Sequence, residues 1–129
     1  MLLREVEIEW RDTIARTQLW AFVAHTSLLF DVRPMQQAFI KANIIFTDGA
    51  TLHLREFIDC SSGSIEKLSY SFHAQDEHQY MIFRYDNAPH KPPLGFAEHK
   101  HCLDGSIIQA DPPLLQTVID EMISIRNYA

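Results

Sequence analysis

Cysteine is scarce in this chain, which has only Cys60 and Cys102 among its 129 residues. Two cysteines cannot build the disulfide framework of a small secreted domain, so both are expected to be free thiols. Glycine is scarce as well, with four residues, and the chain contains no glycine-rich phosphate loop, CxxC pair or Gly-x-Ser-x-Gly elbow. These absences exclude the motif-based classes of nucleotide-binding, redox and serine-hydrolase proteins.

Long apolar runs are also missing. No stretch reaches the roughly 18 apolar residues that a membrane-spanning helix needs, and the opening MLLREVEIEW lacks the basic-then-apolar order of a signal peptide. We therefore expect a cytoplasmic protein that does not associate with membranes. Acidic residues outnumber basic ones, 17 against 11, and the net charge is −6 with histidine neutral. That charge excludes binding of nucleic acid by the whole surface, so any action on nucleic acid requires a local basic site.

What is present is the composition of a globular chain, with 47% hydrophobic and 22% charged residues, and we predict a single domain over residues 1–129. Its middle part alternates apolar and polar residues, which is typical of strands with one buried face. The predicted strands are residues 27–33, 37–47, 50–59, 65–74 and 80–85. A three-residue turn at 47–49 is preferred between two of them, because it places Phe46 opposite Ala50 on one apolar face and Gly49 at a positive φ.

Helical periodicity predicts one helix near the C-terminus. Its apolar positions are Leu114, Leu115, Val118, Ile119, Met122 and Ile125. Asp111 followed by Pro112 is typical of an N-cap and a first-turn proline. At the other end two alternatives stay open, since residues 5–10 alternate like a strand and residues 12–24 suit a helix. The predicted fold class is α+β: an antiparallel meander of about five strands, with the C-terminal helix, and in one alternative an N-terminal helix, on one face.

Titratable chemistry is concentrated in residues 84–101, RYDNAPHKPPLGFAEHKH. Arg84 and Asp86 lie on one side of their strand, where Asp86 is expected to pair with Arg84 or to cap its own turn. If residues 96–102 form a strand, His99 and His101 share a face. The prolines between these segments hold His90 on a defined path.

Other basic residues could contribute to a site here. Lys91 and Lys100 lie within residues 84–101, and parity places His53, Arg55 and His73 on the polar face of the sheet. Acid–base chemistry on a phosphate is one function that fits, because one histidine can accept a proton while another donates one and the basic residues stabilise charge. A zinc site formed by His90, His99 and His101 is the second, and a solvated connection without function is the third.

Four segments resemble the TumE family of small toxins from prokaryotic toxin–antitoxin modules. They are FIKANIIFTDGATLHLREFID, YSFHAQ, MIFRYDNAPHKP and FAEHKHCLDG, and the resemblance runs from about residue 36 to 125, without a counterpart for the first 25 residues. Its most specific part is residues 84–90, followed by His99-Lys100-His101. The resemblance implies a signature site of Arg84, Asp86, Asn87, Pro89, His90, His99 and His101. Family members often have a second histidine where this chain has Lys91, which weakens mechanisms that need adjacent histidines.

The resemblance implies a toxin that restrains growth through translation or RNA, with an antitoxin partner that carries a DNA-binding domain. From the histidines we hypothesise a metal-independent ribonuclease without a cofactor. The expected catalytic residues are His90, His99, His101, Arg84 and Asp86, and the expected substrate-binding residues are Asn87, Lys91, Lys100, Arg55 and His53. The alternatives are a zinc protein and a non-catalytic protein that binds an antitoxin, the ribosome or a phosphorylated ligand. An exposed sheet edge at residues 27–33 makes a homodimer a further hypothesis.

Overall fold

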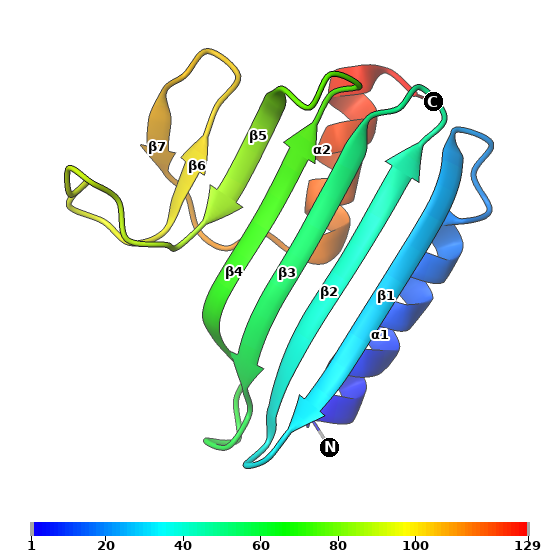
Figure 1. Cartoon of the computed structure of the whole chain (residues 1–129). Helices are drawn as coiled ribbons and strands as arrows, with labels where there is room; N and C mark the ends of the chain where they lie inside the picture. Colours follow the sequence, from blue (N-terminus) through cyan, green and yellow to red (C-terminus); the bar gives the residue numbers. More distant parts are fainter. Residues whose placement is uncertain (1, 129) are drawn as a thin grey trace.

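The computed structural model describes residues 2–128, in which a helix, seven strands and a second helix follow one another (Figure 1). The elements are α1 (Leu2–Thr17), β1 (Val23–Arg33), β2 (Gln37–Phe46), β3 (Thr51–Asp59), β4 (Glu66–Gln75), β5 (Met81–Asp86), β6 (His99–His101), β7 (Ile107–Gln109) and α2 (Leu115–Arg126). The strands form one antiparallel sheet in sequence order, with β1 and β7 at its edges. The α+β prediction is confirmed, and the short strands β6 and β7 extend the predicted meander of about five.

Both helices lie on the same face of the sheet (Figure 1). Alternate residues of the central strands point toward them, which is why the apolar parity of the sequence corresponds to burial. The strand residues without solvent exposure include Ala42, Ile44, Leu52, Leu54 and Phe72, and helix residues such as Trp10, Val118 and Met122 close the core. The opposite face carries the polar residues of the same strands.

The turn between β2 and β3 has the predicted three residues. The Phe46 amide donates to the Ala50 carbonyl at 2.9 Å, and Ile44 pairs with Leu52. Gly49 has a φ of +91°, a conformation that costs a residue with a Cβ about 1–2 kcal/mol. This turn sets the register that keeps the apolar residues of both strands on the helix side.

The N-terminal strand alternative is wrong, because residues 5–10 belong to α1. Alternation over six residues is compatible with either structure, but the buried positions of the whole segment recur at helical spacing. These positions are Leu3, Val6, Trp10 and Ile14. The alternative of a helix over residues 12–24 is right that this end of the chain is helical, but its bounds are wrong. The helix α1 ends at Thr17, and the strand β1 begins at Val23.

The predicted start of the C-terminal helix is also wrong. Leu114, not Asp111, occupies the N-cap, and α2 begins at Leu115. Pro112 and Pro113 explain the delay, because a residue that precedes a proline is disfavoured in the helical region. The predicted apolar stripe is confirmed for its central members, whereas Leu114 lies outside the helix and is exposed.

Within residues 2–128 no helix is both long and apolar enough to cross a membrane.

Candidate functional site

The polar face of the sheet brings residues that are far apart in the sequence into two rows across the strands. Antiparallel pairing sets each residue opposite its partner on the next strand, about 5 Å away. The histidine row contains Asn43, His53, His73, Arg84 and His101, and the aspartate row contains Lys41, Arg55, Ser71, Asp86 and His99. The register therefore joins the 84–101 stretch to the basic residues of β2, β3 and β4.

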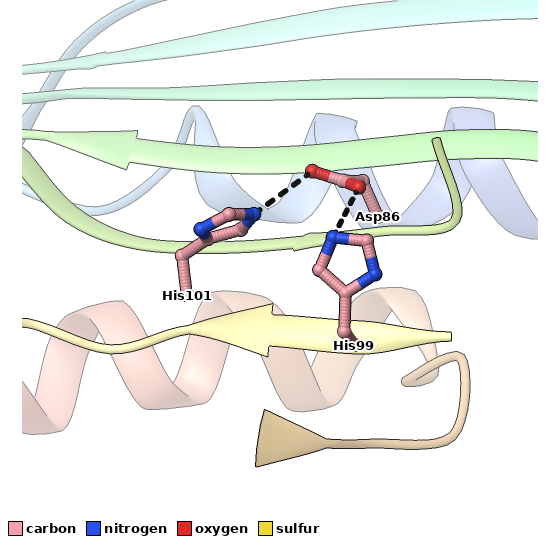
Figure 2. A group of neighbouring side chains, drawn as sticks. All are labelled: Asp86, His99 and His101. Carbon is pink, nitrogen blue, oxygen red and sulfur yellow. Dashed lines mark ion pairs between the residues drawn. The ribbon is translucent and has the colours of Figure 1, made fainter. Parts of the chain in front are cut away.

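Asp86 is the centre of the site, and its carboxylate is buried at the end of β5. Oδ2 accepts a hydrogen bond from Nε of Arg84 at 2.7 Å, and Oδ1 accepts one from the Ala88 amide at 3.1 Å. Nε2 of His99 lies 2.8 Å from Oδ1, and Nε2 of His101 lies 3.8 Å from Oδ2 (Figure 2). Asp86 thus pairs with Arg84 and also caps its own turn, the two roles expected from the sequence.

His99 lies beneath the surface, with 1% of its area exposed. Its Nε2 faces the Asp86 carboxylate, and its Nδ1 lies 2.8 Å from the Ala97 carbonyl oxygen. Carboxylate and carbonyl oxygens only accept hydrogen bonds, so both ring nitrogens of His99 face protein acceptors. His99 is consequently placed to orient Asp86, while its nitrogens are turned away from solvent.

His101 is held by the guanidinium of Arg84. Nη2 of Arg84 lies 3.2 Å from Nε2 of His101, and because a guanidinium only donates, Nε2 must be the unprotonated nitrogen in this arrangement. Burial, followed by the nearby positive charge of Arg84, lowers the pKa of His101 below its ordinary value of 6.5. The imidazole of His101 is therefore neutral near pH 7, which is the state required of a proton acceptor.

His90 reaches the same cluster from the loop after β5. Its ring centroid lies 5.9 Å from that of His101 and 6.0 Å from that of His99. Nδ1 lies 3.1 Å from the Pro92 carbonyl oxygen, so Nδ1 carries a proton and donates it, which leaves Nε2 for a ligand. The structure thus gathers His90, His99 and His101 around Asp86 and Arg84.

Lys100 lies on the other side of the sheet from these histidines. It pairs with Tyr85 in the register, and its Nζ lies 2.6 Å from Oε2 of Glu121 in α2. Burial opposes the charge of the ammonium, but the hydrogen bonds with Glu121 and Tyr85 outweigh it and raise the pKa of Lys100. The expected contact of Lys100 with a phosphate is corrected on this ground, since its side chain points to the helix face.

Asn87 and Lys91 take different positions around the cluster. The side-chain oxygen of Asn87 accepts a hydrogen bond from the Tyr70 amide at 3.2 Å, and its Nδ2 donates to the Leu68 carbonyl at 3.2 Å. Asn87 therefore attaches the loop to β4, and its amide is engaged in that contact. Lys91 is exposed next to His90.

His53 and Arg55 lie two strands from Arg84, beside a hollow of about 330 Å³. The hollow is also lined by His73 and Ser71, which were not among the expected site residues. Parity had already placed His73 on this face, and its pairing with Arg84 in the register is the signal that brings it beside the cluster. The same parity places Ser71 on this face, because it lies two residues before His73 in the strand.

Asp86, His99 and His101 also have to be considered as metal ligands, because one ligand atom from each lies within 4.8 Å of the others. Two observations argue against zinc. The permanent cation Arg84 lies 3.2 Å from Nε2 of His101, where it opposes a second cation. Nδ1 of His99 already faces the Ala97 carbonyl oxygen, which is not among the candidate ligands. We derive no step through a metal.

The buried histidines are expected to make stability depend on pH. Burial, then the charges of Arg84 and His53, lower the pKa of His73, and the pKa of His101 is lowered in the same direction. Between the lowered pKa and the ordinary value of 6.5 the unfolded chain binds more protons, so the free energy of unfolding rises with pH. The contribution of these histidines to the free energy of unfolding is therefore fully present above pH 6.5. It is lost as the pH falls from 6.5 through their lowered pKa in the folded state.

Urea denaturation between about pH 8 and about pH 5 measures this dependence. In a variant with His73→Asn and His101→Asn, the free energy of unfolding should fall less steeply with decreasing pH than in the parent, since the carboxylates titrate alike in both proteins. A His78→Asn variant, which changes an exposed histidine, should show the same pH dependence as the parent. An equal pH dependence of all three proteins would contradict the role given to His73 and His101.

The fold and the site together define a small α+β protein in which a buried aspartate organises histidines and an arginine on one sheet face. The chain belongs to the TumE toxin family, because the family model described as Toxin TumE matches residues 11–127. The match begins well before residue 25, so the expectation that the first 25 residues have no counterpart is wrong for most of that segment. Searches of curated proteins and of solved structures found no match. A toxin role follows from the family, and such a toxin implies an antitoxin partner.

Proposed function

We propose that this toxin cleaves RNA by metal-independent acid–base chemistry in which His101 accepts a proton and His90 donates one. The observation that carries the proposal is the arrangement of these two rings, 5.9 Å apart, with the guanidinium of Arg84 hydrogen-bonded to one of them. A concerted transfer needs one imidazole that accepts a proton and a second that donates one. His99 and Asp86 act as positioning residues for this pair.

The proposed step transfers two protons across one phosphodiester. Nη2 of Arg84 leaves Nε2 of His101 for a phosphate oxygen. The freed lone pair of Nε2 then takes the proton of the ribose 2′-hydroxyl as that hydroxyl oxygen bonds to phosphorus. The bond from phosphorus to the 5′-oxygen breaks, and the 5′-oxygen receives the proton that protonated His90 carries on Nε2. The products are a 2′,3′-cyclic phosphate and a free 5′-hydroxyl. Arg84, which uses two of its five donors for Asp86 and His101, has donors left for the phosphate oxygens.

The charge distribution supports RNA as the target in spite of the net charge of −6. Lys41, Arg55 and Arg84 lie in the two rows on the polar face, where Asp86 is buried and already paired. The acidic residues lie largely elsewhere, as on the exposed side of α1. A local positive region of this kind is what an acidic protein needs to attract a phosphate chain.

Cleavage of a 5′-labelled RNA by the pure protein in the presence of a chelator tests the proposal. We expect cleavage that the chelator does not change, products that end in a cyclic phosphate, and no cleavage when the same sequence carries 2′-O-methyl groups. Absence of cleavage at every ratio of protein to RNA would overturn it in favour of a protein that only binds. For the antitoxin partner we propose a protein with a DNA-binding domain, which co-purification with its genomic neighbour would identify.

A further inference from the structure

Beside the proposed catalytic cluster, the hollow of about 330 Å³ is lined by four polar side chains, His53, Arg55, Ser71 and His73. Among residues 2–128, the guanidinium of Arg55 and the hydroxyl of Ser71 make no hydrogen bond or ion pair with another protein group. Nε2 of His73 is buried and also lacks a hydrogen-bond partner. Three unpartnered polar groups thus meet in one hollow.

The His73 nitrogen is the costly member of this set, because it is buried, whereas Arg55 is exposed to water. A buried polar nitrogen without a partner costs about 1–3 kcal/mol, so native proteins seldom retain one. His53, in contrast, is fully engaged: its Nδ1 donates to Oδ1 of Asn43 at 2.6 Å, and its Nε2 lies 3.2 Å from the Thr51 hydroxyl. His53 therefore forms a fixed wall, while the other three side chains are available to a ligand.

The chemistry of the hollow selects an anion. None of its four lining residues is a carboxylate, and Arg55 contributes a permanent positive charge. Guanidinium, hydroxyl and imidazole N–H groups are donors suited to phosphate oxygens. Burial, Arg84 and His53 lower the pKa of His73, and a bound phosphate would reverse that shift by stabilising the imidazolium.

The register connects the hollow to the cluster. Ser71 is the direct partner of Asp86, and His73 is the direct partner of Arg84, so the two sites are one strand apart, about 5 Å. Arg55 lies one strand further, and Lys41 follows it in the aspartate row. A chain of phosphates that crosses the strands would meet a donor set at each step.

We propose that Arg55, Ser71 and His73 bind a phosphate group of the RNA that neighbours the cleaved one. This subsite rests on the proposed ribonuclease function, since it assigns the second phosphate of the same substrate. It adds His73 and Ser71 to the binding surface and gives the toxin a preference for RNA that continues beyond the cleaved linkage.

The test compares the affinities of a 2′-O-methyl dinucleotide without a terminal phosphate and of its 5′-phosphorylated and 3′-phosphorylated forms, none of which can be cleaved. One of the phosphorylated forms should bind about tenfold more tightly to the parent, as expected for one charge-assisted contact. Arg55→Gln and Ser71→Ala should each lose most of that gain. Arg33→Gln, which changes an exposed arginine paired with Asp31 at the edge of the sheet, should retain it.

An independent arm uses inorganic phosphate and the ring resonances of His73. Phosphate should raise the pKa of His73 in the parent and leave it unchanged in Arg55→Gln. The charged and titratable groups near this ring are His53, Arg55, Arg84, Asp86 and His101, so the Arg55 variant removes only one of them. Cleavage of RNA without any phosphate gain would overturn the subsite alone. A phosphate gain without cleavage would overturn the ribonuclease and the assignment to a neighbouring phosphate, and would leave only phosphate binding by Arg55, Ser71 and His73.

Discussion

Replacing His101 with alanine is expected to lower the rate of RNA cleavage by about 100-fold to 10,000-fold, the range that a general acid or base usually contributes. His101 contributes its unprotonated Nε2, which Arg84 holds at 3.2 Å, and no other ring nitrogen of the cluster is held by that guanidinium. The fold should persist, because Arg84 keeps its bond to Asp86 and the His101 ring contributes little to the apolar core. Initial rates on labelled RNA, with circular dichroism as a check on folding, measure the effect.

His90→Ala should reduce the rate over a similar range, because it removes the proton donor of the proposed step. His78→Ala is the matched control, since His78 is an exposed histidine in the turn before β5. In cells, the His90→Ala, His101→Ala double variant should no longer restrain growth. Growth arrest at parental strength by that variant would show that these histidines do not carry the toxicity.

Asp86→Ala is expected to reduce the free energy of unfolding by about 1–3 kcal/mol, the usual cost of leaving buried hydrogen-bonding groups without their partner. The cost stays in this range because the Arg84 side chain is 37% exposed and can turn to water. The carboxylate receives hydrogen bonds or ion pairs from Arg84, His99 and the Ala88 amide, so its removal takes an acceptor from all three groups. The loss should also lower cleavage, because His99 and Arg84 lose the group that orients them. Urea denaturation measures the stability.

Two comparisons sharpen this prediction. Asp86→Asn keeps an oxygen for the Ala88 amide and should cost less than the alanine variant. Asp12→Ala, which removes an exposed carboxylate from α1, should change stability by less than about 0.5 kcal/mol. A loss for Asp86→Ala no larger than that of Asp12→Ala would contradict the central role of this carboxylate.

The central strands and their turn could be predicted from the sequence because both depend on neighbouring residues. Alternation over ten residues decides which side chains face the core, and the turn at Gly49 is the short connection that keeps Phe46 and Ala50 on one face. The segment 5–10 could not be assigned in the same way. Its alternation suits a strand, and it is the packing of Trp10 and Ile14 against the sheet that stabilises a helix there.

In the candidate site, too, the features that depend on neighbouring residues could be predicted from the sequence, and those that depend on distant residues could not. The pattern of residues alone predicts that Arg84 shares a side with Asp86 and that His99 shares one with His101, because the two-residue period of a strand is local. Strand pairing and helix packing bring these two pairs together, add His90 to them, and direct Lys100 to Glu121 instead. Strand pairing also places His73 and Ser71 beside the cluster. The physical reason is that the register between strands comes from pairing over long separations in the chain, which no local pattern encodes.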